Sequence, residues 1–155
     1  MPSGGECEIN SIAYSADLLV AEGFIEPHFF AGFSGGRKSI LPGVAGRKTV
    51  LANHCFEFIN HPNARTGILE DNPIHKDMLW AAQKANLSYI VNVVINSKKQ
   101  VIYAVAGNSV EAMHMIPAHS LTEAVDMAKE IINKENPGIV AIPEGVSVIV
   151  RKGKK

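Results

Sequence analysis

The sequence predicts an α/β fold in which a mixed β-sheet carries flanking helices. Three observations predict it: short apolar runs rich in β-branched residues, segments with apolar residues at three- and four-residue steps, and the alternation of the two along the chain. The chain has 155 residues, of which 46% are hydrophobic, so it can bury a core without disulfides or a structural metal. We therefore predict one compact α/β domain over residues 1–155.

Five short segments have the composition of β-strands. The run 18–25 predicts a buried strand, and the runs 88–95 and 101–106 predict a hairpin because a polar segment separates them. Residues 139–142 and 146–150 predict two further strands joined by a tight turn. We expect the N-terminal and C-terminal strands to share one sheet.

Other segments have helical signals. Between residues 48 and 59 the apolar side chains recur at three- and four-residue steps, which predicts one helix with His54 on its apolar face. The pair Asn72-Pro73 is typical of a helix start, and residues 120–123 form a capping box ahead of a further helix. Residues 107–119 are interpreted as a helix followed by an edge strand.

Charge and cysteine content narrow the classes of function. Fifteen basic residues balance fifteen acidic ones, so we expect neither nucleic acid nor a membrane as a partner. Cys7 and Cys55 cannot form a disulfide framework in a chain of this size, which predicts free thiols in a reducing compartment. The longest uninterrupted apolar run, 101–106, is about a third of the roughly 18 residues that indicate a membrane span. The first residues lack a secretory pattern, so we expect a cytoplasmic protein.

The densest functional signal is the segment 26–39, Glu-Pro-His-Phe-Phe-Ala-Gly-Phe-Ser-Gly-Gly-Arg-Lys-Ser. It follows a predicted strand, where α/β sheets usually bind ligands, and its glycines let the backbone approach a ligand closely. The segment is nearly a P-loop, but Arg37 stands where the second glycine is required, which disfavours a nucleotide triphosphatase. An anion- or nucleotide-binding scaffold and a plain surface loop with solvated Arg37 and Lys38 both remain open.

Two histidines have both a structural and a functional interpretation, and a third has a structural one. His28, directly before the glycines, is either a general acid/base or a side chain that hydrogen-bonds the loop backbone. His54 is either a boundary residue of its helix or a metal ligand whose partners come from elsewhere, such as a cofactor, because no second ligand stands at zinc spacing. His75 lies near a helix N-terminus, where a neutral imidazole with a structural role is expected.

Several blocks of the sequence are specific enough to compare with a known family. They are residues 26–43 (which include His28 and Lys38), the pair Asn53-His54, residues 63–69, the stretch from 72 to about 107, and residues 111–150. Together these blocks strongly resemble the nickel-dependent lactate racemase family, in its catalytic, nickel-pincer-nucleotide subunit.

The resemblance implies an isomerase that interconverts D- and L-2-hydroxy acids such as lactate by hydride transfer. Its cofactor is a nickel pincer nucleotide (pyridinium-3-thioamide-5-thiocarboxylic acid mononucleotide with nickel), joined to a lysine that corresponds to Lys38. His54 corresponds to the histidine that completes the nickel coordination, and His28 to one of two catalytic histidines. The implied partners are a 2-hydroxy acid and the proteins that make the cofactor. Arg37 is expected to meet the cofactor's phosphate.

The chain also departs from the family, whose members are much longer and have two domains. The second catalytic histidine and the substrate-binding arginine have no counterpart here, and two family segments join directly near residues 107–111. We therefore expect a truncated and internally deleted relative, a partial version of the two-domain lactate racemase fold, with little or no activity by itself. The alternative from another class is a non-catalytic fragment that folds and binds an anion at Gly35-Gly36.

Overall fold

The structure is a computed structural model that describes residues 1–108, 116–117, 126, 130 and 139–142. Its elements, in chain order, are α1 (Ser11–Tyr14), β1 (Leu18–Phe24), β2 (Pro27–His28), β3 (Gly32–Phe33), the 3₁₀ turn η1 (Gly36–Ser39), α2 (Arg47–Asn53), α3 (Phe56–Ile59), α4 (Pro73–Lys84), β4 (Leu87–Ile95), β5 (Val101–Asn108), β6 (Ile116–Pro117) and β7 (Ile139–Ile142).

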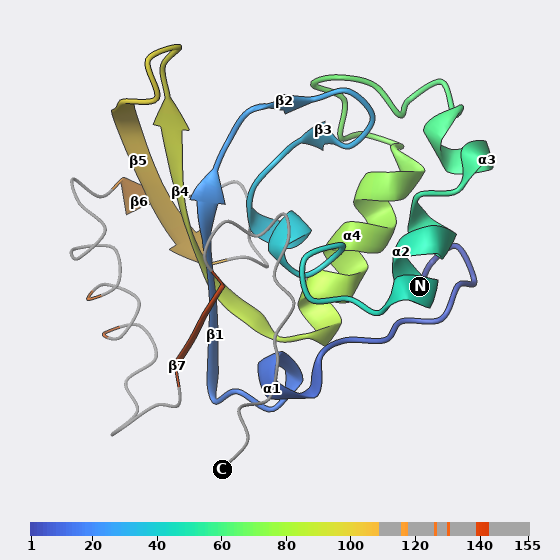
Figure 1. The fold of residues 1–155 in the computed structure, drawn as a ribbon, viewed down its shortest axis with the longest axis horizontal. Helices are drawn as coiled ribbons and strands as arrows, with labels where there is room; N and C mark the ends of the chain where they lie inside the picture. Colours follow the sequence, from blue (N-terminus) through green and yellow to red (C-terminus); the bar gives the residue numbers. More distant parts are fainter. Residues whose placement is uncertain (109–115, 118–125, 127–129, 131–138, 143–155) are drawn as a thin grey trace.

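A mixed five-stranded sheet confirms the predicted α/β class. Its strand order is β6-β5-β4-β1-β7, with β1 parallel to both β4 and β7 and with β4 and β5 forming an antiparallel hairpin. Strand β1 therefore pairs directly with β7, so N-terminal and C-terminal strands share one sheet, as predicted. Helix α4 lies beside the sheet, and α2 and α3 lie beyond it on the same side (Figure 1).

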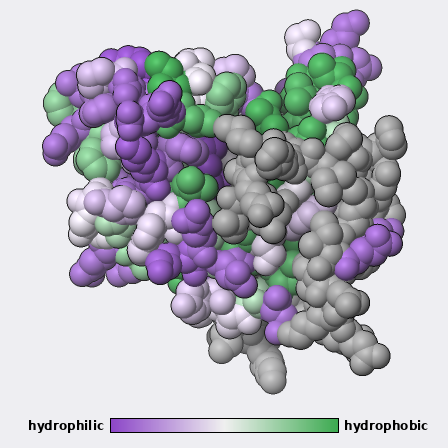
Figure 2. Space-filling view, turned by 180° about the vertical axis from the view of Figure 1, so that it is seen from behind, coloured by the Kyte–Doolittle hydropathy of each residue, from purple (hydrophilic) through white to green (hydrophobic). Residues whose placement is uncertain are grey.

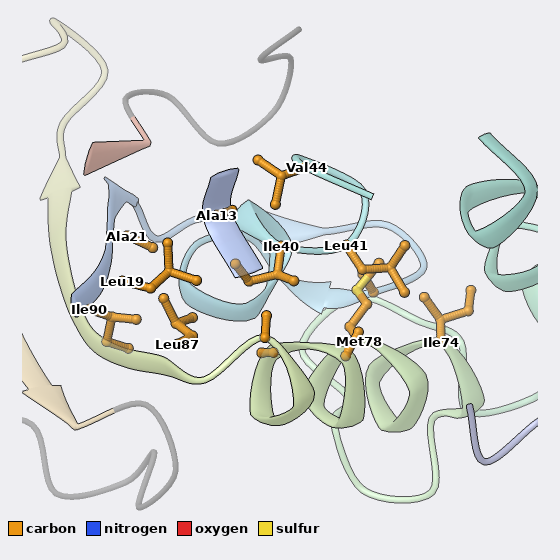
Figure 3. Packing of buried hydrophobic residues seen from close by; sticks show 14 of the residues in the cluster. Ala13, Leu19, Ala21, Ile40, Leu41, Val44, Ile74, Met78, Leu87 and Ile90 are labelled. Atoms are coloured by element: carbon orange, nitrogen blue, oxygen red, sulfur yellow. The ribbon is translucent and has the colours of Figure 1, made fainter. Parts of the chain in front are cut away.

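Helix α4 begins where the sequence predicts. The side-chain oxygen of Asn72 accepts hydrogen bonds from the backbone N–H groups of Ile74 (3.1 Å) and His75 (3.2 Å), and Pro73 takes the first helical position. The buried face of the helix includes Ile74 and Met78, which lie beside Leu41 (Figure 3) and belong to the same core cluster as residues of the sheet. This face anchors the helix against the parallel strands.

Both faces of the central strands are apolar. On the α4 face, Leu19 and Ala21 of β1 and Ile90 of β4 belong to the main core (Figure 3). On the opposite face, Tyr89 and Val91 alternate with those residues and form a second buried cluster with Ala106. This alternation explains why β1 and β4 appear in the sequence as nearly continuous apolar runs.

The single helix predicted over residues 48–59 is wrong. Helix α2 ends at Asn53, and His54 leaves helical geometry with φ −98° and ψ 35°. Cys55 is extended, with φ −76° and ψ 160°, and precedes α3. The periodic spacing misled because Leu51 is exposed rather than on a buried face. His54 consequently stands at a helix end, where its ring can turn toward residues outside the helix.

Several sequence predictions fall outside the described residues. The strand 146–150 is among them. Of the helix expected after residues 120–123, the structure describes Asp126 and Glu130, which are helical. Of the helix expected in the first part of residues 107–119, it describes Gly107 and Asn108, which belong to strand β5 instead. The edge strand expected by residue 119 corresponds to β6, which lies at an edge of the sheet. The single-domain boundary 1–155 and its junction near 107–111 stay predictions. Among the described helices, none is long and apolar enough to cross a lipid bilayer.

The β4–β5 hairpin carries exposed apolar side chains. Val101, Ile102 and Tyr103 are exposed, and the space-filling view shows apolar residues gathered on this hairpin below a hydrophilic tip (Figure 2). In the described part of the chain, β5 pairs with β6 only through Val105 and Ala106. The first half of β5 is therefore an apolar edge, a feature that proteins generally cover or charge.

We predict that Met78→Ala destabilises the fold strongly. Met78 is fully buried in the core beside Leu41, so truncation leaves a cavity as well as losing apolar burial. The free energy of unfolding, measured by urea denaturation, should fall by roughly 2–5 kcal/mol.

Gln83→Ala is the matched control, since Gln83 lies on the exposed side of the same helix. Its free energy of unfolding should stay within about 0.5 kcal/mol of the parent value. Equal effects of the two substitutions would contradict the packing of α4.

Candidate functional site

The segment between β1 and α2 lies at the carboxyl end of the parallel β1–β4 pair. After β1 the chain forms the small antiparallel pair β2–β3, which lies near the start of α4 (Figure 1). It then enters η1, which packs against β1, β4 and α4. The predicted location of a ligand site, just beyond the end of a parallel strand, is therefore occupied by this glycine-rich segment.

Two glycines let the segment approach its neighbours closely. Gly32 has φ +79°, and a Cβ there would lie 2.6 Å from the Ile68 carbonyl oxygen. Gly35 also has φ +79°, and its Cβ would lie 3.0 Å from Oδ1 of Asn92 on β4. A side chain at either position would be strained in conformation and would collide with a neighbour. The two glycines therefore allow the loop to pack closely against strand β4 and against the segment 61–72.

His28 is tied to the turn that follows it. Its Nδ1 accepts a hydrogen bond from the Ala31 N–H at 3.2 Å, with the Phe30 N–H at 3.5 Å, and its ring stacks on Phe29 at 4.7 Å between centroids. Burial, together with the positive charges of Lys38, His54 and Arg37, lowers the pKa of His28 to about 4. The ring is therefore neutral near pH 7. Because Nδ1 accepts, Nε2 carries the hydrogen and remains for other partners.

Lys38 is a buried lysine within η1. Lys38 is 8% exposed. Among the described residues, its Nζ forms no hydrogen bond or ion pair. Burial and the Arg37 charge lower the pKa of Lys38 to about 8, against the opposing effect of Glu26. At pH 7.5 about a quarter of such amines are neutral, against about 0.1% at the ordinary lysine value. The neutral form of Lys38 is therefore more populated near neutral pH than that of a surface lysine.

His54 meets the same aromatic cluster. Its ring stands edge-on to Phe30 at 5.2 Å, and Phe30 stands edge-on to His28 at 4.5 Å. Burial and the Lys38 charge lower the pKa of His54, while the nearby Val50 carbonyl opposes this shift. Within the described part of the chain, His54 Nδ1 is buried and makes no well-formed hydrogen bond. The structure therefore brings both His28 and His54 into ring contact with Phe30, and the Lys38 charge lies close enough to both imidazoles to lower their pKa values.

His54 is the candidate metal ligand among these residues. No group of three or more His, Cys, Asp or Glu side chains in the described residues is arranged to hold a metal ion. A metal at His54 would need its remaining donors from a bound cofactor, as the sequence analysis supposed. The neutral, half-buried imidazole of His54 fits that arrangement, because metals bind the unprotonated ring.

The sequence analysis missed the roles of Arg37 and His75. Arg37 does not reach outward toward an anion, because its Nε donates to His75 Nδ1 at 2.9 Å and its Nη2 donates to the Ala31 carbonyl at 2.7 Å. His75 is neutral as expected, with its pKa lowered to about 4 by burial and by Arg37. Arg37 and His75 are 38 residues apart in the chain, so no local sequence pattern predicts that they pair.

Comparison with known protein families places the chain. Residues 1–67 match the family model described as the lactate racemase N-terminal domain, and residues 74–150 match that of the lactate racemase C-terminal domain. The chain belongs to the lactate racemase family. His28, Lys38 and His54 lie in the first matched segment, and His75 lies in the second. The Arg37–His75 hydrogen bond and the β1–β4 pairing therefore join the two segments of the lactate racemase match.

Two curated lactate racemases are close relatives over part of their length. The protein from Thermoanaerobacterium thermosaccharolyticum is 67% identical over 112 residues, which is 72% of this chain and 26% of the relative. The protein from Lactiplantibacillus plantarum is 60% identical over 116 residues, 75% of this chain and 27% of the relative. The chain thus spans about a quarter of the length of these lactate racemases.

Solved structures agree with the fold. The lactate racemase apoprotein from Thermoanaerobacterium thermosaccharolyticum matches with a TM-score of 0.70 and 58% identity, over 84% of this chain and 28% of that protein. A Thermotoga maritima protein matches with a TM-score of 0.54 at 24% identity, over 81% of this chain and 30% of that one, which supports the fold only. The described α/β structure is accordingly a partial version of the lactate racemase fold.

We predict that the chain loses stability on acidification below pH 6.5. The folded-state pKa values of His28, His54 and His75 lie below the unfolded value, so the unfolded state binds more protons as pH falls toward 4. The free energy of unfolding, measured by urea denaturation at pH 7.0, 5.5 and 4.5, should decrease along this series.

His75→Gln separates the imidazole effect from that of carboxylates. Its amide oxygen can still accept from Arg37 Nε, but the side chain does not titrate. The variant should lose less unfolding free energy between pH 7.0 and 4.5 than the parent chain. Identical pH dependence in the two proteins would refute the buried neutral state of His75.

Proposed function

We propose that the chain carries the cofactor-attachment and metal-binding part of a lactate racemase site. In this proposal a nickel pincer nucleotide is joined covalently to Lys38, and its nickel is completed by His54. The observation that carries the proposal is a buried lysine, without an ion pair among the described residues, whose charge acts on the nearby neutral imidazole of His54. Family membership supports it, since the relatives matched over these residues are lactate racemases.

Lys38 has the properties that covalent attachment requires. An amine must be unprotonated to form the thioamide link, and burial beside Arg37 supplies that neutral form near pH 7.5. Its position in η1, which packs against both β1 and β4, fixes the attachment point to the sheet. The tether would therefore place the cofactor at the carboxyl end of the parallel strands.

His54 supplies one nitrogen donor to a metal. Its place at the end of α2 frees the ring from helical geometry, and contact with Phe30 restricts its motion. Nickel accepts imidazole readily, and the cofactor would supply the remaining donors. Because no group of three or more His, Cys, Asp or Glu side chains in the described residues could hold a metal ion, His54 fits such a cofactor better than it fits a free metal ion.

His28 would handle the hydroxyl proton of the substrate. When bound, the cofactor supplies the hydride acceptor for C2 of a 2-hydroxy acid. Nε2 of His28 is the nitrogen left for substrate, because Nδ1 is held by the Ala31 N–H. To accept a proton at Nε2, the ring must first move its hydrogen to Nδ1, which breaks that hydrogen bond. The turn at Ala31 would therefore affect proton transfer at His28 as well as the conformation of the loop.

The proposal also extends to partners and location. The substrate is lactate or a related 2-hydroxy acid, and cofactor-biosynthesis proteins deliver the nickel pincer nucleotide to Lys38. We propose a cytoplasmic location, where thiols such as Cys7 and Cys55 remain free.

The first test is attachment. The chain, purified from cells that make the cofactor, should show a mass gain in intact mass spectrometry, mapped to Lys38 by peptide analysis. Lys38→Arg should lose the gain completely, because a guanidinium keeps the charge but does not form the link. Lys48→Arg, at an exposed lysine, should keep it.

A further variant separates the tether from the metal. His54→Ala should keep the organic mass on Lys38 but lose bound nickel, measured by elemental mass spectrometry. A mass gain that persists in Lys38→Arg, or nickel retained in His54→Ala, would overturn the corresponding assignment.

The second test is activity of these 155 residues by themselves. We expect little conversion of D- to L-lactate even after loading, because a carboxylate needs a bidentate arginine clamp and the Arg37 guanidinium is engaged with Ala31 and His75. His28 can serve one hand of the substrate, and a missing acid/base typically costs about 10² to 10⁴-fold in rate.

His28→Ala is the control for any residual rate. Robust conversion that disappears in His28→Ala would show that the chain is a complete enzyme, contrary to this expectation. Absence of both mass gain and turnover would favour the alternative of a non-catalytic scaffold.

A further inference from the structure

Arg37 is a mostly buried cation that has only neutral partners. Its guanidinium donates to the Ala31 carbonyl at 2.7 Å, to His75 Nδ1 at 2.9 Å and, more weakly, to the Gly35 carbonyl at 3.5 Å. No carboxylate forms an ion pair with it among the described residues. Burial lowers the pKa of Arg37 to about 10, so the charge is nevertheless retained at neutral pH.

Such an arrangement is costly for stability by itself. A buried charge is usually paired, and replacing an unpaired one by an apolar side chain is often stabilising. The three acceptors all come from positions around Lys38: Ala31 follows β2, Gly35 precedes η1, and His75 lies in the first turn of α4. Arg37 therefore links the η1 turn, which carries Lys38, to the β2–β3 turn and to the start of α4.

We propose that Arg37, locked in place by His75, is the positioning residue for Lys38. Its forked guanidinium fixes the η1 turn against α4 and holds a permanent positive charge next to the Lys38 amine. The significance of that amine rests on the proposed function. The bridge itself rests on the contacts above.

His75 has the form that this role needs. Nδ1 of an imidazole accepts a hydrogen bond only when it carries no proton. Burial and the Arg37 charge lower the pKa of His75, so its Nδ1 is free to accept from Arg37. Asn72 also holds these segments together. Its Oδ1 accepts from the backbone N–H of His75, and its Nδ2 donates to the Phe30 carbonyl at 2.9 Å. The start of α4 thus holds both Arg37 and the β2–β3 turn.

The experiment measures Lys38 directly, without cofactor. The purified chain is treated with limiting N-hydroxysuccinimidyl acetate between pH 6.5 and 10, and acetylation of each lysine is followed by peptide mass spectrometry. Lys48 and Lys84, which are exposed, serve as internal references. The readout is the pH at which the Lys38 rate is half its limiting value.

Arg37→Gln should raise this midpoint and lower the Lys38 rate at pH 7.5 by about fivefold, since the neighbouring charge is gone. Arg37→Lys keeps a charge and should restore most of the midpoint. His75→Leu, which removes the acceptor, should shift the midpoint in the same direction as Arg37→Gln. His75→Gln, which keeps an acceptor, should resemble the parent chain.

Met78→Ala controls for general loosening of the fold. It weakens the core without touching Arg37, so it should leave the Lys38 midpoint unchanged. The inference is overturned if folded Arg37→Gln and His75→Leu keep the parent midpoint, or if Met78→Ala shifts it equally. If one of Arg37→Gln and His75→Leu fails to fold, the midpoint of the other decides the test.

The outcome is separable from that of the proposed function. If the midpoint shifts as expected but no cofactor mass attaches to the parent chain, Arg37 positions Lys38 and the attachment role fails. If mass attaches equally in the parent chain and in Arg37→Gln, with an unchanged midpoint, attachment stands and the positioning role fails.

Discussion

The fully buried amide of Asn72 is the interaction on which the candidate site depends. Its Oδ1 accepts from the N–H groups of Ile74 and His75, and its Nδ2 donates to the carbonyls of Phe30 and Ile68. One side chain thereby starts helix α4, holds the β2–β3 turn and fixes the preceding loop. Because buried polar groups are costly when unpaired, all four partners constrain each other's positions.

The electrostatics of the site follow from burial, because among the described residues no carboxylate forms an ion pair with Arg37 or Lys38. Lys38 and Arg37 are cationic neighbours, and Glu26, which opposes the shift at Lys38, is exposed. Positive charge and desolvation act in the same direction on the nearby imidazoles, which stay neutral. A site of this kind favours nucleophilic amine and unprotonated nitrogen donors, and it would gain stability from an anionic ligand.

The sequence predicts those parts of the structure that local signals specify. Strand β1, the β4–β5 hairpin and the start of α4 at Asn72 each follow from residues adjacent in the chain, and all three are confirmed. The break at His54 could not be predicted, because periodic spacing continues through it while the backbone turns away. The family resemblance identified His28, Lys38 and His54 as candidates, and the structure shows their proximity rather than their roles.

The Arg37–His75 pair illustrates why the rest escaped prediction. The sequence shows a basic residue in a glycine-rich loop, and the ordinary interpretation of that pattern is an outward-facing anion contact. Only the tertiary fold brings α4 beneath the loop and offers the guanidinium an internal acceptor. The position of His75 near a helix N-terminus predicted that its imidazole is neutral, but it did not predict which residue the imidazole contacts.

The same turn couples the two chemical roles proposed for this chain. The peptide group of Ala31 donates its N–H to His28 Nδ1, and the residue's carbonyl accepts from Arg37, which neighbours Lys38. A shift of this turn would change the tautomer of His28 and the environment of Lys38 together. If both proposed roles hold, attachment and proton transfer would therefore not be tuned independently. Such a coupling would give the Arg37 charge, which has no ion pair among the described residues, a function beyond stability.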